Sequence, residues 1–270
     1  MHKTHRRDFT GLKKHSHTQR LRILKKLVIP ALRRELGTNM IAVAVDGSVA
    51  RHEDTAYSDL ELMIFVKNKR RLPHGFSRVH DGLLIEGLFI TEKDYYKMIL
   101  EPNPQWYLAG SDILLPVLNK KFLKKLTDYR VRNKNKKCES LARGSLHEVQ
   151  EAFGKLFTAI DKKNRENLFV ILSDVVLSVL KMLSFINGKP YTSSGRFITE
   201  AKKFKKKPAG FDEFIKLVST ARYHDWRDLE KHAIKLFKGI EDYFRVKYED
   251  AMYDSDLRII YRKKRNKKRR

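Results

Sequence analysis

The sequence has 270 residues and a hydrophobic content of 41%, enough for one large domain or two small domains with a buried core. It has no apolar run near the roughly 18–20 residues that span a bilayer and no signal peptide, which predicts a cytoplasmic protein with no membrane partner. Its one cysteine, Cys138, excludes an intrachain disulfide and a cysteine-based zinc site. A formal net charge of +26 favours an anionic partner, with nucleic acid the leading candidate, over a basic surface without such a partner.

A helix is predicted over residues 17–36, because apolar side chains recur there at helical spacing. Pro30 should bend or split this helix, since proline has no backbone N–H to donate, and Gly37 is expected to end it. Residues 40–45 (MIAVAV) then form a short continuous apolar run, which is typical of a strand buried on both faces.

Two further strands are expected at residues 58–66 (SDLELMIFV) and 83–90 (LLIEGLFI). The basic segment 67–71 and the Leu-Pro-His-Gly sequence that follows it indicate a turn or loop between these strands. Thr91 is the predicted N-cap of a helix over residues 92–100.

The pattern becomes almost wholly helical after about residue 118. Candidate helices cover residues 119–130, 145–161, 166–187, 194–206, 211–223 and 227–248. The sequence therefore predicts an α/β (α+β) N-terminal domain, residues 1–118, with a short mixed sheet and a basic N-terminal arm. An all-α helical bundle, residues 119–248, and a basic tail, residues 249–270, are expected to follow it.

Three carboxylates fall on the predicted strands. Asp59 and Glu61 are two residues apart, so both side chains should point to the same face of their strand. Glu86 lies on the next strand, at a position between aliphatic neighbours. Carboxylates paired on an apolar strand repel each other unless a cation lies between them, and Mg²⁺ is bound by carboxylates and phosphates together. The alternative is a solvated edge strand for Asp59 and Glu61, and an ordinary exposed glutamate at position 86.

Gly47 and Ser48 directly follow the first predicted strand. Glycine lets the backbone approach a phosphate closely, and Ser48 offers a hydroxyl and a backbone N–H to phosphate oxygens. Arg51 lies between this pair and the acidic strand, within reach of a triphosphate. A Gly-Ser pair alone is usually a turn. A strand, Gly-Ser and then, about ten residues later, a strand that opens with Asp-x-Glu is a specific pattern for phosphoryl transfer.

The segment Val43–Val66 (VAVDGSVARHEDTAYSDLELMIFV) resembles the signature of the nucleotidyltransferase superfamily related to DNA polymerase β. It is most similar to the kanamycin (aminoglycoside) nucleotidyltransferases, in which Gly-Ser is followed by Gly-Arg or Ala-Arg and then by Tyr-Ser-Asp-x-Glu. The helical half is similar as well, through Glu151-Ala-Phe-Gly-Lys155 and through Tyr191-Thr-Ser. The resemblance covers roughly residues 20–248.

This resemblance implies the transfer of a nucleoside monophosphate from a nucleoside triphosphate (NTP) to a hydroxyl acceptor, with release of pyrophosphate. Asp59, Glu61 and Glu86 would bind Mg²⁺ (or Mn²⁺) and, through it, the NTP. Asp59 and Glu61 would therefore take part directly in catalysis.

The resemblance also implies roles for residues outside the acidic strands. Gly47, Ser48 and Arg51 would hold the phosphates of the NTP. Glu151 would be the general base that deprotonates the acceptor hydroxyl, and Lys155 would neutralise charge on the triphosphate. Family members are homodimers whose sites combine the N-terminal domain of one subunit with the helical domain of the other, so a homodimer is expected.

The sequence departs from the family at residues 67–71 (KNKRR), where the kanamycin enzymes have a glutamate-rich segment that suits a polycationic drug. The four positive charges in this segment would repel a polycation. Basic residues in the predicted helix 119–130 and in the tail 262–270 extend the positive surface. RNA, such as a tRNA acceptor end, is therefore the expected acceptor. The alternatives are an aminoglycoside-like small-molecule nucleotidyltransferase and a non-catalytic RNA-binding protein on the same scaffold.

Overall fold

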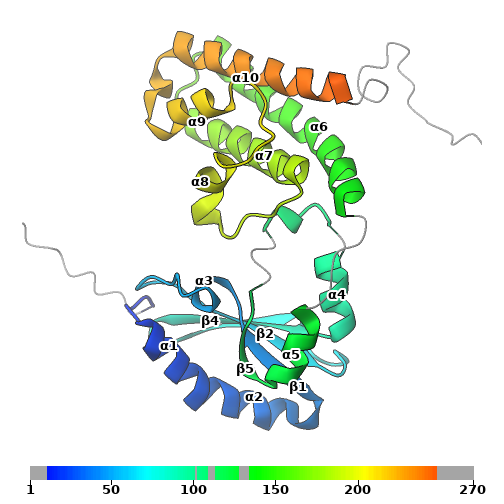
Figure 1. Ribbon diagram of the computed structural model, residues 1–270. Helices are drawn as coiled ribbons and strands as arrows, with labels where there is room; N and C mark the ends of the chain where they lie inside the picture. Colours follow the sequence, from blue (N-terminus) through cyan, green and yellow to red (C-terminus); the bar gives the residue numbers. More distant parts are fainter. Residues whose placement is uncertain (1–10, 101, 109–112, 128–133, 248–270) are drawn as a thin grey trace, which may run out of the picture. The chain divides into compact units, whose positions relative to one another are not determined.

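The computed structural model describes residues 11–100, 102–108, 113–127 and 134–247 (Figure 1). The chain divides into two compact units. The first combines Met1–Gly144 with Leu180–Phe204 and contains the sheet, and the second combines Ser145–Val179 with Lys205–Arg270. The domain boundary near residue 118 stays a prediction, and the basic tail 249–270 lies outside the described residues.

The first unit is built around a mixed sheet. Its five strands are β1 (Met40–Val45), β2 (Leu60–Val66), β3 (Gly75–His80), β4 (Leu83–Ile90) and β5 (Leu115–Leu118). They lie in the order β3-β4-β2-β1-β5, with β2 and β4 parallel and the other neighbours antiparallel. The predicted fold class, a short mixed sheet followed by a helical half, is confirmed.

One face of the sheet is covered by the first helices. Side chains of alternate β2 residues, including Leu60 and Leu62, pack there with Leu24 and Leu32. These helices are α1 (His17–Ile23) and α2 (Ile29–Leu36), and they form the layer that covers this face of the sheet. Because successive strand residues point to opposite faces, Glu61 lies on the other side of the sheet.

Among the described residues, the helices that pack on the opposite face lie towards one end of the strands. Phe65 and Ile90 pack there against Tyr95 of α4 (Glu92–Leu100) and against Leu123 and Leu126 of α5 (Lys120–Thr127). The N-cap of α4 is Thr91, as predicted, because its hydroxyl accepts from the N–H of Asp94 at 3.2 Å. The carboxylates of the acidic strands lie on this same face, beyond the helices.

The first predicted helix is interrupted by a π-helical segment, Leu24–Val28, between α1 and α2. In this wider turn the N–H of Ile29 donates to the carbonyl of Leu24, five residues back. The next residue, Pro30, has no N–H to donate, and a widened turn accommodates its ring. The helix then ends at Gly37, which has a positive φ of 50°, as the sequence predicts.

Two edge strands, β3 and β5, were not expected from the sequence. The residues from Ser77 to His80 in β3 are all exposed, so they show no alternation of apolar and polar side chains. β5 is short and contains Pro116, which disfavours a strand but is tolerated at a sheet edge. Both strands are therefore specified by their partners β4 and β1 more than by their own residues.

The remaining long helices are α6 (Lys134–Asp161), α7 (Leu168–Asn187), α9 (Phe211–Ser219) and α10 (Trp226–Lys247), with the shorter α8 (Phe197–Ala201) before α9. α6 begins well before the predicted start at residue 145. In the second unit the ring of Phe153 lies 6.2 Å from that of Phe214 and 5.1 Å from that of Phe237. This aromatic cluster joins α6 to α9 and α10.

α7 corrects one expectation from the sequence. It is long and apolar enough to cross a membrane by length and composition, with a mean hydropathy of 2.2 over an 18-residue window. The expectation that no apolar run approaches this length is therefore wrong for α7. Within that window 56% is buried, including Leu172, Val175 and Leu183, so α7 is a core helix of the fold.

Candidate active site

Three carboxylates meet at one end of β2 and β4. Asp59 immediately precedes β2, Glu61 is the second residue of β2, and Glu86 lies directly opposite Glu61 in the parallel register with β4. One oxygen from each of the three lies within 4.8 Å of the others, and all three residues are half-buried. The residues predicted to bind metal are therefore brought together by the sheet.

Burial and mutual repulsion disfavour the charged forms of these groups. The pKa of Glu61 is raised to about 7 by burial first, and then by the charges of Asp59, Asp46 and Glu86. Burial also raises the pKa of Asp59, and the charge of Glu86 adds to this effect. A hard divalent cation between the oxygens would relieve both effects, so this donor set fits such an ion.

The backbone at Gly47 leaves space for the Glu61 carboxylate. Gly47 has a φ of +67°, and a Cβ atom at this position would lie 1.6 Å from Oε2 of Glu61. The carboxylate of Asp46 accepts a hydrogen bond from the N–H of Gly47 at 2.7 Å. The N–H of Asp46 in turn donates to the carbonyl of Glu61 at 2.9 Å. The predicted contact of Gly47 with phosphate stays a prediction.

Ser48 and Arg51 flank this turn. Ser48 is half-buried in the short helix α3 (Gly47–Ala50). The Nε atom of Arg51 donates to Oε2 of Glu53 at 2.9 Å, and the Arg51 side chain is only 7% exposed. The other oxygen of Glu53 lies 3.0 Å from Nη1 of Arg196, which belongs to the same compact unit. Arg51 is close enough to Glu61 to lower its pKa, but in this structure its guanidinium binds Glu53.

The edge strand β3 adds a residue that the sequence did not indicate. Ser77 lies opposite Glu86 in the β3–β4 ladder, and its hydroxyl donates to Oε1 of Glu86 at 2.7 Å. A pocket of about 470 Å³ adjoins this pair and the Glu61 carboxylate. It is lined by Asp46, Glu61, Leu62, Met63, His74, Gly75, Phe76, Ser77, Glu86, Gly87 and Leu88. The acidic cluster therefore opens into a space of the size that small-molecule ligands occupy.

The other predicted catalytic residues lie on α6 in the second unit. Nζ of Lys155 lies 2.9 Å from Oε1 of Glu151, one helical turn earlier, and 3.8 Å from Oδ2 of Asp174 on α7. Both Glu151 and Lys155 are well exposed, and their ion pair lowers the pKa of Glu151 and raises that of Lys155. The structure thus pairs these two residues with each other, and their catalytic roles stay predictions.

Residues 121–249 match the family model described as the KNTase C-terminal domain. The matched segment contains Glu151 and Lys155, the two helical residues that the resemblance assigned to catalysis. This segment is similar to the C-terminal domain of the kanamycin nucleotidyltransferases. This match agrees with the kanamycin nucleotidyltransferase-like relationship predicted from the sequence, and it supports a nucleotidyltransferase.

One solved structure is described as a nucleotidyltransferase-like protein from Exiguobacterium sibiricum 255-15. It aligns with 83% of this chain and 75% of its own chain, at 9% sequence identity and a TM-score of 0.49. No curated protein matches the sequence.

Proposed function

We propose that this chain is a metal-dependent nucleotidyltransferase that moves a nucleoside monophosphate from an NTP to a hydroxyl group of an anionic acceptor, with RNA as the acceptor class. The observation that carries the donor half of the proposal is the cluster of Asp59, Glu61 and Glu86, whose oxygens lie within 4.8 Å of one another. The relationship to the kanamycin nucleotidyltransferases supports the reaction type.

In the proposed reaction the acceptor oxygen attacks the α-phosphorus of the NTP. The bond from that phosphorus to the α–β bridging oxygen breaks, and pyrophosphate leaves. When bound, Mg²⁺ or Mn²⁺ supplies neutralisation of the phosphate charge at the carboxylates. Asp59, Glu61 and Glu86 would hold the ion and so position the triphosphate, and the absence of a side chain at Gly47 leaves room beside Glu61.

Glu151 accepts the proton of the acceptor hydroxyl in this proposal. Its carboxyl group is exposed and therefore ionised at neutral pH, and the hydrogen bond from Lys155 lowers its pKa further. Lys155 is already held beside Glu151 at 2.9 Å, and its charge would lie near the leaving pyrophosphate. The support for both roles is the family resemblance of the Glu-x-x-x-Lys segment.

The positive charge of α5 supports an anionic acceptor. Leu123 and Leu126 face the core of the sheet, whereas Lys120, Lys121, Lys124 and Lys125 are exposed on the outer side of the helix. α5 covers the same face of the sheet on which Glu61 and Glu86 project. A polyanion bound to the carboxylate end of this face would therefore meet the lysines as it extends along the strands.

The basic segment 67–71 supports the same acceptor class. Lys67, Arg70 and Arg71 are exposed, whereas Lys69 forms an ion pair with Asp94 at 2.8 Å. This segment follows the end of β2 that is remote from Glu61, at a distance of about 20 Å for six strand residues of roughly 3.3 Å each. An acceptor that contacts both places must be long, which favours RNA over a small molecule.

The proposed enzyme is a homodimer, as in the related family. α7 exposes three large apolar side chains, Phe169, Val170 and Leu177, at 67%, 65% and 47%. These positions fall within about a quarter of the helix circumference at 3.6 residues per turn, so they form one apolar face. A second copy that covers this face would remove it from water. Phe169→Glu should then shift the protein to monomer in light scattering, whereas the same change at the exposed Lys162 should not.

The reaction is tested by incubating the protein with Mg²⁺ and each α-labelled NTP in turn, in the presence of total RNA or of kanamycin. Label is expected to move to RNA and not to kanamycin, with release of pyrophosphate. Asp59→Asn and Glu61→Gln should abolish transfer. Asp81→Asn removes one carboxylate at an exposed position of the same unit and should leave transfer unchanged.

Other outcomes select the alternatives. Efficient labelling of kanamycin would show an aminoglycoside-like enzyme and overturn the RNA acceptor. RNA binding without transfer or pyrophosphate release, equal in the unmodified protein and in Asp59→Asn, would show a non-catalytic RNA-binding protein. Glu151→Gln should lower transfer while leaving NTP affinity unchanged, and full activity of that variant would remove Glu151 as the base.

A further inference from the structure

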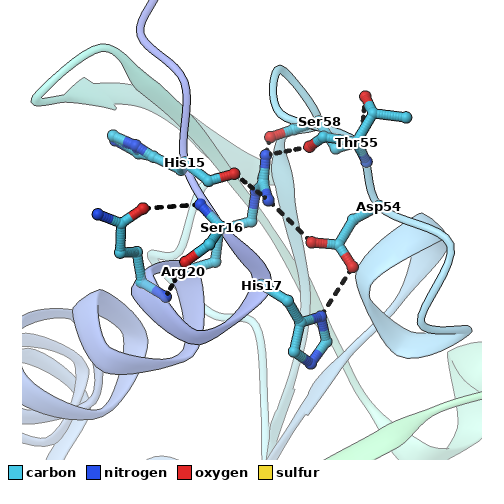
Figure 2. Close-up of polar contacts among 8 residues, drawn as sticks. His15, Ser16, His17, Arg20, Asp54, Thr55 and Ser58 are labelled. Atoms are coloured by element: carbon cyan, nitrogen blue, oxygen red, sulfur yellow. Dashed lines mark hydrogen bonds and ion pairs between the residues drawn. The ribbon is translucent and has the colours of Figure 1, made fainter.

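A buried arginine forms hydrogen bonds with the loop that precedes β2 (Figure 2). Arg20 of α1 is only 1% exposed. Its guanidinium donates to the carbonyl of Ser58 at 2.9 Å, the carbonyl of His15 at 2.9 Å, the carboxylate of Asp54 at 2.8 Å and the carbonyl of Thr55 at 2.6 Å. Three of these four acceptors belong to the loop between α3 and β2, so one side chain holds several points of that loop.

Asp54 completes the buried ion pair. Its side chain is 3% exposed, with Oδ2 bound to Arg20 and Oδ1 2.7 Å from Nδ1 of His17. A buried ion pair is costly unless its polar atoms are satisfied, and here both carboxylate oxygens have partners. The pair is therefore a specific connection between α1 and the loop and not a surface contact.

The helix end that carries Arg20 is itself fixed. Ser16 caps α1 by accepting from the N–H of Gln19 at 3.2 Å, and the Gln19 side chain accepts from the N–H of Ser16 at 2.7 Å. The N–H of His15 donates to the carbonyl of Ala56 at 2.8 Å. These contacts, together with the packing of Leu24, directly after α1, in the core beside the sheet, hold α1 against the loop.

Asp59 directly follows the loop residues that Arg20 binds. The β2–β4 register begins at Leu60, so Asp59 precedes the strand pairing. Its carboxylate faces those of Glu61 and Glu86, and repulsion among them pushes it away from the site. Arg20 binds the carbonyl of Ser58, the residue covalently joined to Asp59, and so opposes that movement.

We propose that Arg20 and Asp54 are positioning residues, which hold Asp59 in the geometry that binds a divalent cation together with Glu61 and Glu86. This inference rests on the proposed function, because it takes the three carboxylates to be the cation site. Arginine is required rather than lysine, since the planar guanidinium offers donors in several directions whereas an ammonium is a compact point charge. Arg20→Lys therefore keeps the positive charge and removes the geometry.

Two measurements test this inference. Electron paramagnetic resonance measures Mn²⁺ binding in the absence of NTP, and hydrogen exchange measures the opening of the backbone amides of residues 52–60. Arg20→Lys and Asp54→Asn should weaken Mn²⁺ binding about tenfold or more and speed exchange in this segment, with exchange in β1 unchanged. In transfer assays they should raise the KM for the NTP more than they lower kcat. Arg22→Lys is the matched control, because Arg22 is exposed on the same helix.

The outcomes separate this inference from the proposed function. Mn²⁺ binding that is lost in Asp59→Asn but stays within twofold in Arg20→Lys would overturn the positioning role alone. A lack of Mn²⁺ binding in the unmodified protein would overturn the cation site and the inference with it. If Arg20→Lys does not fold, His17→Phe replaces it. That variant removes the hydrogen bond between the His17 ring and Asp54 and keeps an aromatic ring beside His52. It should weaken Mn²⁺ binding severalfold, and unchanged binding would overturn the role.

Discussion

Gly47 and Glu61 occupy adjoining space at the acidic cluster. A Cβ atom on Gly47 would lie 1.6 Å from Oε2 of Glu61, and the φ of Gly47 is +67°. A side chain at this position would therefore have two effects: it would strain the backbone, and it would displace a carboxylate that is proposed to bind the cation. A comparison of two glycines separates these effects.

Gly47→Ala should lower transfer about 100-fold, because a displacement of roughly 1 Å at a reacting centre has an effect of this size. Gly37→Ala is the matched control, since Gly37 also has a positive φ, of 50°, but a Cβ there would have no atom within 4 Å. Both variants should lose roughly 1–3 kcal/mol of unfolding free energy from backbone strain, measured in urea. Equal activity of the two variants would show that the collision with Glu61 does not matter.

The raised pKa of Glu61 predicts a pH dependence of stability. In the folded state this pKa is about 7, against 4.5 for the free side chain, so the folded protein binds more protons than the unfolded chain between these values. The unfolding free energy in the absence of divalent cations should therefore fall as the pH rises through this window. The expected loss is on the order of 2 kcal/mol, after allowance for the partial exposure of the group.

Urea unfolding at a series of pH values measures this effect. Glu61→Gln should flatten the slope between about pH 4.5 and pH 7, because it removes the group that titrates there. Saturating Mg²⁺ should flatten the slope as well, since the bound cation keeps Glu61 of the folded protein ionised throughout this window. An unchanged slope in Glu61→Gln would assign the titration to other groups.

The strands and carboxylates of the site can be predicted from the sequence because they depend on patterns of neighbouring residues. The continuous apolar runs of residues 40–45 and 83–90 correspond to β1 and β4 without a shift. The two-residue spacing of Asp59 and Glu61 placed both carboxylates on one face. The prediction that Glu86 joins them required one further assumption, that its strand lies beside β2. The register of β2 and β4 confirms this assumption.

The part that sequence reasoning missed depends on partners remote in the chain. Ser77 lies on an exposed edge strand with no pattern of its own, and its contact with Glu86 exists only because β3 pairs with β4. Arg20 looks like one more basic residue of the N-terminal region. Its burial depends on Asp54, 34 residues later, and on loop carbonyls that no local pattern predicts.

The lysines of α5 should contribute to binding of the RNA acceptor. Replacement of Lys120, Lys121 and Lys124 by glutamine removes three positive charges from the sheet face that carries the carboxylates. The slope of log affinity against log salt concentration should decrease by roughly 0.7 for each phosphate of single-stranded RNA that the variant no longer neutralises. Transfer to RNA should fall at physiological salt, whereas the affinity for the NTP should not change.

The control for this prediction removes the same charge from the other side of the sheet. Arg22, Lys25 and Lys26 are exposed on the α1–π-helix segment, which packs on the face opposite α5. Their replacement by glutamine should leave the salt dependence of RNA binding nearly unchanged. Equal losses of affinity in the two triple variants would mean that RNA responds to net charge alone and not to the α5 surface.

We expect Glu53 and the phosphates of the NTP to compete for the guanidinium of Arg51. Arg51 donates to Glu53 at 2.9 Å, and a triphosphate beside Glu61 would offer the guanidinium a more highly charged partner. Arg51→Gln should therefore raise the KM for the NTP at least about tenfold, the loss expected for one charged hydrogen bond of roughly 1.5–3 kcal/mol, and leave Mn²⁺ affinity without NTP close to that of the unmodified protein. Glu53→Gln should lower the KM, because it weakens the contact that the phosphates must replace. Steady-state kinetics measures both variants, and a Glu53→Gln variant with a raised KM would show that Glu53 orients Arg51 towards the substrate and does not compete with it.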